Sequence, residues 1–263
     1  MNAAADTAPS PLLTCDELDV AVAGRTLVRS LHLQVHAGNV MCVLGRNGAG
    51  KTLTLQTLAG LRSPARGSVS VEGRLIEEWP RKQLAQRLGL LTQHTEDPFP
   101  SSVMETALIG RHPHIGFWQW ESAADREVAA AALAAVDVAE LATRDIDTLS
   151  GGERRRVAIA TLLAQDPRLL LLDEPINHLD PHHQLDALRL LQERASRGCA
   201  VIMSLHDAGM AARFCDQALL LFGDGEWLSG PADQILTETT ISRLYGVTVR
   251  EVRWEGGRTF VAI

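Results

Sequence analysis

The sequence is poor in cysteine, with only Cys15, Cys42, Cys199 and Cys215 among its 263 residues. These four lie far apart and form no Cys-X-X-Cys pair, so neither a disulfide framework nor a zinc site is expected. This cysteine usage is typical of a protein of the cytosol.

Long apolar runs are missing as well. The longest stretch of small apolar residues, 128–136, is far too short to cross a bilayer, which takes about 20 residues in a helix. Residues 1–11 have neither a basic start nor an apolar centre, so we expect a flexible leader rather than a signal peptide. Work at a membrane would therefore require a partner protein.

An excess of basic residues is also absent, because the formal net charge is −7. Nonspecific binding to nucleic acid draws on clustered Lys and Arg, so this charge disfavours nucleic acid as a partner. The length and the 46% hydrophobic content predict one large globular domain, or a domain with a lobe inserted into it.

Short apolar runs bounded by turn residues predict the strands of an α/β protein. Antiparallel strands are expected within 18–35, and buried strands at 39–45, 88–93, 168–174, 199–206 and 217–222. Helices are expected at 51–61, near Arg81, and between Asp180 and Gly198. This alternation predicts a mainly parallel sheet with helices on both faces.

Between residues 94 and 165 the pattern is helical throughout, and Pro98, Pro100 and Pro113 interrupt its beginning. We expect a helical subdomain inserted into the α/β core. The predicted division is a leader at 1–11, a core at 12–93 and 166–247, a helical subdomain at about 94–165 and a C-terminal extension at 248–263.

The stretch GRNGAGKT, residues 45–52, matches the phosphate-loop pattern between a predicted strand and a predicted helix. Its glycines allow backbone N–H groups to turn toward phosphates. Lys51 would reach the β and γ phosphates, and the Thr52 hydroxyl would hold Mg²⁺. The sequence therefore predicts a nucleoside triphosphate site formed by Gly45, Arg46, Asn47, Gly48, Ala49, Gly50, Lys51 and Thr52.

Two carboxylates follow a wholly apolar strand in LLLLDE, residues 169–174. Open parallel sheets bind their ligands at this end of the strands. We expect Asp173 to hold magnesium and Glu174 to act as the general base that deprotonates an attacking water. Gln93 and His206 also end predicted strands, although a single polar residue in that position is common.

The stretch DTLSGGERRRVAIA, residues 147–160, predicts a second anion site. Ser150 and Glu153 form a capping box that begins an amphipathic helix. That motif does not explain Gly151 and Gly152, each of which costs about 1 kcal/mol relative to alanine inside a helix. Two residues without side chains at a helix N-terminus let an anion approach free N–H donors.

The order of these motifs resembles the ATP-binding cassette of ABC transporters. The phosphate loop is followed by Gln93, LSGGE at 149–153, LLLLDE at 169–174, NHLD at 177–180 and SLHD at 204–207. The resemblance runs from about Leu12 to Tyr245. It implies a P-loop NTPase core of the RecA-like type, with an antiparallel β subdomain and an inserted α-helical subdomain.

The resemblance also implies roles for individual residues. Gln93 would sense magnesium and the attacking water, His206 would contact the γ phosphate, and Asp180 would couple two subunits. Ser150, Gly151 and Gly152 would bind the γ phosphate of ATP held by a second cassette. Two copies would thus close head to tail on two ATP molecules, most simply as a homodimer.

Within the family, GRHPH at 110–114, LLAQDP at 162–167 and HDAGMAARFCD at 206–216 resemble the importers of ferric siderophores, haem and cobalamin. The implied protein is an ATPase at the cytoplasmic face of the inner membrane. Its partners would be transmembrane permease subunits and, indirectly, a substrate-binding protein. One departure is Val22, which stands where the family usually carries an aromatic that stacks on adenine.

Three other functions are compatible with parts of this sequence. A soluble ABC-type ATPase acting on ribosomes or DNA usually carries two cassettes or a long coiled-coil insertion, and neither is present here. A small-molecule kinase could use the same phosphate loop but has no use for LSGGE. An exporter half is disfavoured by the absence of a spanning segment.

The histidine pairs 112/114 and 182/183 lack further metal ligands and are expected at the surface.

Overall fold

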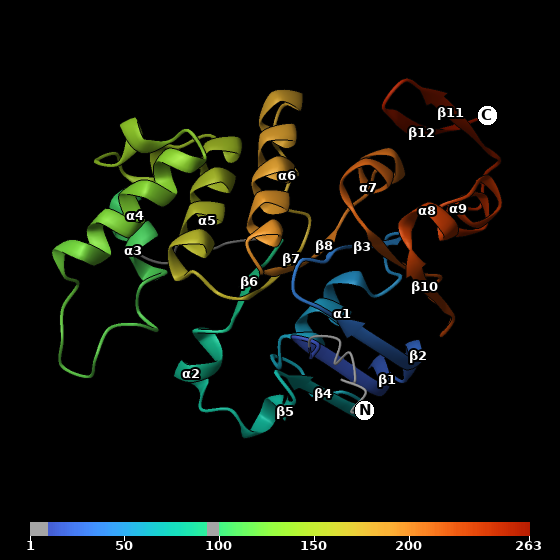
Figure 1. Ribbon diagram of the computed structural model, residues 1–263, viewed down its shortest axis with the longest axis horizontal. Helices are drawn as coiled ribbons and strands as arrows, with labels where there is room; N and C mark the ends of the chain where they lie inside the picture. The colour runs from blue at the N-terminus through green and yellow to red at the C-terminus, as the bar shows by residue number, and fades with distance from the viewer. Residues whose placement is uncertain (1–9, 94–99) are drawn as a thin grey trace, which may run out of the picture.

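The computed structural model describes residues 10–93 and 100–263. A central sheet separates two groups of elements (Figure 1). An antiparallel sheet lies on one side, and helices α3, α4, α5 and α6 lie on the other. Most of the expected leader, 1–11, and the expected break at Pro98 fall outside the described residues.

The central sheet has the strand order β10-β9-β3-β8-β7-β6, in which all strands except β10 are the predicted buried strands. Neighbouring strands are parallel from β9 to β6, whereas β10 pairs with β9 in the antiparallel sense. The carboxyl ends of β3, β6, β7 and β8 therefore meet at one edge. The strand bounds are β3 Val40–Gly45, β6 Leu88–Leu91, β7 Leu169–Leu172, β8 Ala200–Ser204, β9 Gln217–Leu221 and β10 Trp227–Pro231.

The second sheet is antiparallel, as predicted for this part of the chain, in the order β2-β1-β4-β5. β1 Leu13–Val22 and β2 Arg25–Val35 form a hairpin across two residues, Ala23 and Gly24, which have φ values of 49° and 77°. Positive φ at both turn positions matches the twist of the flanking strands. β4 Arg66–Val71 and β5 Arg74–Leu75 complete this sheet.

The core lies on both faces of the central sheet because adjacent strand residues point to opposite faces. In the fully buried strand β3, Cys42 and Leu44 pack toward α5, α6 and α7, whereas Met41 and Val43 pack toward the antiparallel sheet. The helix α1, Lys51–Leu58, fills the space between the two sheets through Leu55 and other apolar residues.

Helices alone form the regular elements of residues 100–165, as the sequence predicts. Helices α3, α4 and α5 pack together at one side of the molecule (Figure 1). Each begins with a capping box, formed by Ser102, Ser122 and Ser150 with the acidic residue three positions later. The bounds are α3 Val103–Ile109, α4 Ala123–Ala135 and α5 Gly151–Gln165, with 3₁₀ turns at Ala139–Leu141 and Ile146–Thr148.

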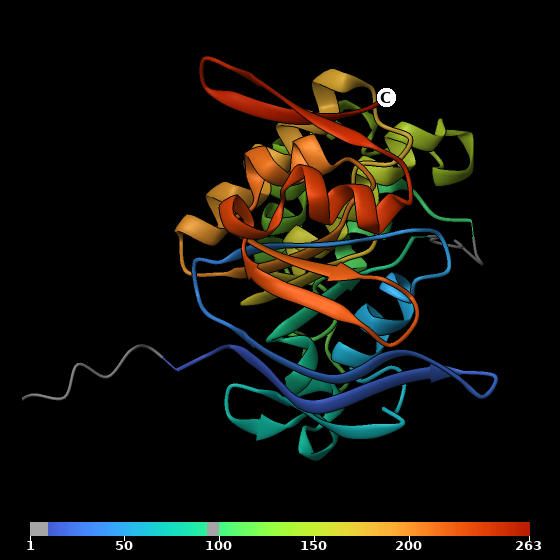
Figure 2. The same cartoon turned by 90° about the vertical axis from the view of Figure 1, so that its right-hand side faces the viewer.

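The C-terminal segment forms elements that the sequence pattern does not predict. A hairpin of β11 Val249–Trp254 and β12 Gly257–Ala262 lies at the end opposite the antiparallel sheet and packs beside α7 Ala208–Phe214 (Figure 2). The helices α8 Ala232–Ile235 and α9 Glu238–Tyr245 precede it. The remaining helices are α2 Arg81–Ala85 and α6 Pro181–Ser196, with a 3₁₀ turn at Ile76–Glu78.

Several elements end earlier than the sequence predicts. α1 stops at Leu58 instead of about Leu61, because the chain turns through Gly60 with a φ of 69°. β6 and β7 stop at Leu91 and Leu172, so the functional side chains that follow them lie on loops. All four cysteines are buried and unbridged. Within the described residues, no helix is long and apolar enough to cross a membrane.

The lack of a side chain at Gly110 allows α3 to approach α5 closely. A Cβ built at this position would lie 2.1 Å from the backbone oxygen of Thr161. We expect Gly110→Ala to lower the free energy of unfolding by about 1–3 kcal/mol, since the two helices must separate. Urea unfolding followed by circular dichroism measures the change. Gly230→Ala is the control, because its Cβ would meet only the Ile235 side chain at 3.3 Å. Equal losses in the two variants would contradict this explanation.

Candidate nucleotide site

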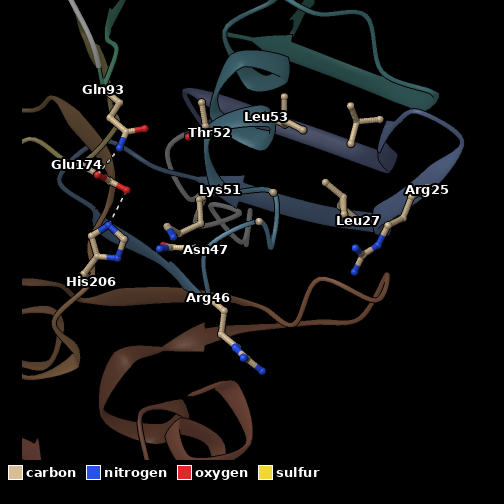
Figure 3. Close-up of a pocket in the computed structure, with 13 residues that line it drawn as sticks. Arg25, Leu27, Arg46, Asn47, Lys51, Thr52, Leu53, Gln93, Glu174 and His206 are labelled. Atoms are coloured by element: carbon tan, nitrogen blue, oxygen red, sulfur yellow. Dashed lines mark hydrogen bonds and ion pairs between the residues drawn. The ribbon is translucent and has the colours of Figure 1, made fainter. Parts of the chain in front are cut away.

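A cavity of about 460 Å³ opens at the carboxyl edge of the central sheet (Figure 3). Open parallel sheets place their ligands at this edge. One end of the cavity holds Gln93, Glu174 and His206, the middle holds Asn47 and Lys51, and the far end holds Arg25 and Leu27. The other lining residues are Val22, Arg46, Gly48, Gly50, Thr52 and Leu53.

The loop between β3 and α1 forms the middle of the cavity. Gly48 and Gly50 have φ values of 79° and 103°, a region that favours glycine. At Gly45, glycine is required by packing, since a Cβ there would lie 2.7 Å from the Leu221 carbonyl oxygen. Ala49 is buried and does not line the cavity. The loop can thus present backbone N–H groups and the start of α1 to an anion.

Lys51 is the cation placed in the middle of this cavity. Its side chain is only 6% exposed, and its Nζ donates a hydrogen bond to the Gly45 carbonyl at 2.9 Å. Burial lowers the pKa of Lys51, while the nearby carboxylates of Glu174 and Asp173 act in the opposite direction. A buried ammonium beside a loop of backbone N–H donors is suited to binding phosphate.

Asp173 joins the phosphate loop to the next strand. Its Oδ2 accepts a hydrogen bond from Thr52 Oγ1 at 2.6 Å, and its Oδ1 accepts one from Ser204 Oγ at 2.5 Å. Ser204 also accepts a bond from the Glu174 backbone N–H at 2.8 Å. A carboxylate beside a threonine hydroxyl is the kind of oxygen set that Mg²⁺ prefers. The donor chemistry of Thr52 and Asp173 therefore fits that ion.

The Glu174 carboxylate is the centre of the polar end of the cavity. Its Oε2 accepts a hydrogen bond from Gln93 Nε2 at 2.8 Å and a further bond from Asn177 Nδ2. Its Oε1 lies 2.6 Å from His206 Nε2. Glu174 is 6% exposed, and its φ of 51° turns the backbone out of β7. Three predicted catalytic side chains, from the ends of β6, β7 and β8, thus meet.

Arg155 stabilises the carboxyl edge of the central sheet from its buried side, although the sequence pattern gives this residue no special role. Its guanidinium donates to the backbone oxygens of residues 92, 173, 174 and 175, at distances from 2.5 to 3.2 Å. Burial lowers the pKa of Arg155 to about 10, so it remains charged at neutral pH. Arg155 thereby connects α5 to the loops that carry Gln93 and Glu174.

His206 is held by the C-terminal segment. The hydroxyl of Tyr245, the only tyrosine of the chain, donates to the His206 carbonyl at 2.9 Å. Burial raises the pKa of Tyr245 to about 12, so the hydroxyl keeps its proton over the physiological range. The position of His206 thus depends on α9 as well as on β8.

The second predicted anion site lies outside the cavity. Ser150 and Gly151 are exposed at the start of α5, where the Ser150 Oγ accepts a bond from the Glu153 N–H at 3.3 Å. A Cβ at Gly152 would lie 3.0 Å from the backbone oxygen of His178. Asp180 caps α6 by accepting the His183 N–H at 3.0 Å, and this bond lowers the pKa of Asp180.

The structure thus adds residues to those expected from the sequence. Ser204 lies within SLHD and Asn177 within NHLD, so both belong to motifs that the sequence shows. Their contacts with Asp173 and Glu174 become visible only in the tertiary structure.

Of the histidine pairs, His112, His114 and His182 are exposed, and His183 is partly buried. Among the described residues, no group of three His, Cys, Asp or Glu side chains is arranged to hold a metal ion.

The buried guanidinium generates a stability prediction. Arg155→Met leaves the carbonyls of four residues without this donor, and we expect a loss of about 3 kcal/mol in the free energy of unfolding. Urea unfolding monitored by tryptophan fluorescence measures it. Arg154→Met is the matched control, because within the described residues the Arg154 side chain makes a single hydrogen bond, to Asp147 O at 3.3 Å. We expect a loss below about 1 kcal/mol there. A similar loss of unfolding free energy in both variants would show that the hydrogen bonds of Arg155 are unimportant for stability.

Known proteins resemble this chain over most of its length. A family model described as ABC transporter matches residues 28–177, more than half of the chain. The hemin import ATP-binding protein HmuV of Gloeobacter violaceus is 40% identical over 250 residues, covering 92% of this chain and 90% of the relative. The ferric enterobactin transport ATP-binding protein FepC of Escherichia coli is 35% identical over 234 residues, covering 88% and 86%.

Solved structures share the fold. One described as an inward-facing metal-chelate type ABC transporter matches with a TM-score of 0.84 and 27% identity, covering 97% of this chain and 98% of that one. The structure of cbiO1 from Clostridium perfringens, part of the ABC transporter complex cbiONQ, matches with a TM-score of 0.74 and 25% identity, covering 89% and 94%. With its phosphate loop and the buried Glu174 carboxylate in one cavity, the chain belongs to the ABC transporter family and is an ATP-binding ATPase with the P-loop NTPase fold.

Proposed function

We propose that this ATPase energises a binding-protein-dependent membrane importer whose cargo is haem, a ferric siderophore or cobalamin. The names of the relatives, a hemin importer and a ferric enterobactin transporter, support this cargo class. The observation that carries the proposal is that two surfaces suited to anions lie on separate parts of one chain. A complete phosphate-loop cavity lies at the sheet edge, and an exposed serine-glycine helix start lies on α5.

Hydrolysis is assigned to the polar end of the cavity. Glu174 is the general base that takes a proton from the attacking water. Lys51 and the N–H groups of residues 46–52 hold the β and γ phosphates. His206 contacts the γ phosphate and Gln93 orients the water, so the bonds of both side chains to Glu174 must rearrange as substrate enters.

Mg²⁺ is assigned to Thr52, Asp173 and Gln93. When bound, the ion neutralises part of the charge on the β and γ phosphates. Thr52 Oγ1 and Asp173 Oδ2 lie 2.6 Å apart, so these two oxygens would be available to hold the ion. Ser204 keeps the Asp173 carboxylate oriented through its bond at 2.5 Å.

A second cassette, most simply an identical copy, completes each site. Ser150, Gly151 and Gly152 of one copy bind the γ phosphate held by the other, and Asp180 couples the two copies. Support comes from the exposure of Ser150 and Gly151 and from their position outside the cavity of their own chain. Bound ATP would favour the closed pair, and hydrolysis would remove that preference.

The helical subdomain, about 94–165, would dock on the permease at the cytoplasmic face of the inner membrane. Gln93 would link that contact to Glu174, to which it donates at 2.8 Å. The core would comprise 12–93 and 166–247, followed by the extension at 248–263. A substrate-binding protein would act indirectly, by delivering cargo to the permease.

A soluble ABC-type ATPase acting on ribosomes or DNA is the competing function. The net charge of −7 and the importer names of the relatives disfavour it. Co-sedimentation of the native protein with ribosomes rather than membranes would favour this alternative.

Glu174→Gln tests the assigned base. The amide keeps the shape of the side chain but takes no proton, so we expect kcat to fall at least about a hundredfold, while ATP-dependent dimerisation persists. Phosphate release and size-exclusion chromatography with ATP provide the two readouts. Glu226→Gln, an exposed carboxylate outside the cavity, should leave kcat unchanged. Wild-type turnover in Glu174→Gln would remove the role given to Glu174.

Uptake in cells tests the importer itself. Cells carrying Glu174→Gln in place of the native protein should lose uptake of one of three labelled cargoes, haem, ferric siderophore or cobalamin, while the other two are retained. The loss follows because transport depends on hydrolysis. Glu226→Gln cells are the control and should take up all three. Retention of all three cargoes, with no second cassette able to substitute, would refute the importer function.

A further inference from the structure

The far end of the cavity is where a nucleotide base must lie if its phosphates occupy the loop around Lys51. Arg25 and Leu27 lie at that end, on the side away from Glu174 (Figure 3), and Val22, the strand partner of Arg25, also lines the cavity. No phenylalanine, tyrosine or tryptophan occurs among the described residues that line the cavity. A base therefore needs another flat or apolar surface to replace contact with water.

The β1–β2 hairpin sets the positions of these three side chains. Val22 and Arg25 are direct partners in the antiparallel register, on either side of the two-residue turn. Side chains of such a pair lie on the same face of the sheet. Leu27 is buried against the phosphate loop, where a Cβ on Gly50 would approach it to 3.1 Å. The hairpin tip thus continues the cavity outward from the phosphate loop.

Arg25 is held in place at this tip. Its Nη2 donates a hydrogen bond to the Gly223 carbonyl at 2.7 Å, in the turn between β9 and β10. An N–H bond uses the edge of the planar guanidinium, so the faces of the plane stay available for stacking. Val22, which is 41% exposed, adds an aliphatic surface beside it.

We propose that the nucleotide base stacks on the Arg25 guanidinium, with Val22 and Leu27 as the apolar wall, and that Arg25 replaces the aromatic ring missing at position 22. Guanidinium planes stack on nucleic acid bases in the same way as aromatic rings. Gly223 fixes the plane in advance, which reduces the rotamer freedom lost on binding. This proposal rests on the proposed ATP-hydrolysing site.

The test separates the base from the phosphates. We expect Arg25→Ala to weaken binding of the ATP analogue AMP-PNP about tenfold in isothermal titration calorimetry, a change of about 1.4 kcal/mol. Binding of inorganic tripolyphosphate, which has no base, should change less than about twofold. Arg25→Lys keeps the charge but not the plane, so it should resemble Arg25→Ala. Arg29→Ala, on the same strand but outside the cavity lining, is the matched control.

A rescue variant tests the stacking surface itself. Val22→Tyr combined with Arg25→Ala should regain most of the affinity for AMP-PNP, because a ring then stands beside the lost plane. Equal weakening of AMP-PNP and tripolyphosphate by Arg25→Ala would overturn the proposal, since Arg25 would then act on the phosphates. Full affinity in Arg25→Ala or in Arg25→Lys would also overturn it. Failure of the wild type to bind either ligand would instead refute the proposed function.

Discussion

The arrangement of the nucleotide site depends on the hydrogen bonds of the Arg155 guanidinium. The guanidinium is buried behind the carboxyl edge of the central sheet and donates to four carbonyls on the loops after β6 and β7. Arg155 belongs to α5, whose exposed N-terminus is the proposed anion site for a second copy. One helix therefore connects the loops of Gln93 and Glu174 with a separate surface.

The buried charges at this edge compensate one another. Lys51 and Arg155 carry the positive charge, Asp173 and Glu174 carry the negative charge, and all four are largely removed from water. Burying a charge alone is costly, so each requires a nearby opposite charge or several hydrogen bonds. A triphosphate entering beside Lys51 would disturb this balance, which gives a physical reason for the Glu174 contacts to rearrange.

Segments distant in sequence control the same few side chains. His206 is held at its carbonyl by Tyr245 of α9, and Arg25 is held by Gly223 in the β9–β10 turn. Both anchors come from the C-terminal third of the chain, which also forms the unexpected β11–β12 hairpin. The β9–β10 turn and α9 therefore belong to the architecture of the site.

The sequence alone determined the parallel sheet, the phosphate loop and the polar residues at strand ends, because local periodicity and motif spacing encode them. The helical character of 100–165 was equally local. Only the tertiary structure decided the partners of Glu174, the role of Arg155 and the place of Arg25. Gln93 lies 81 positions before Glu174, and His206 lies 32 after it. Such contacts follow from the order of strands in the sheet, and no local pattern specifies that order.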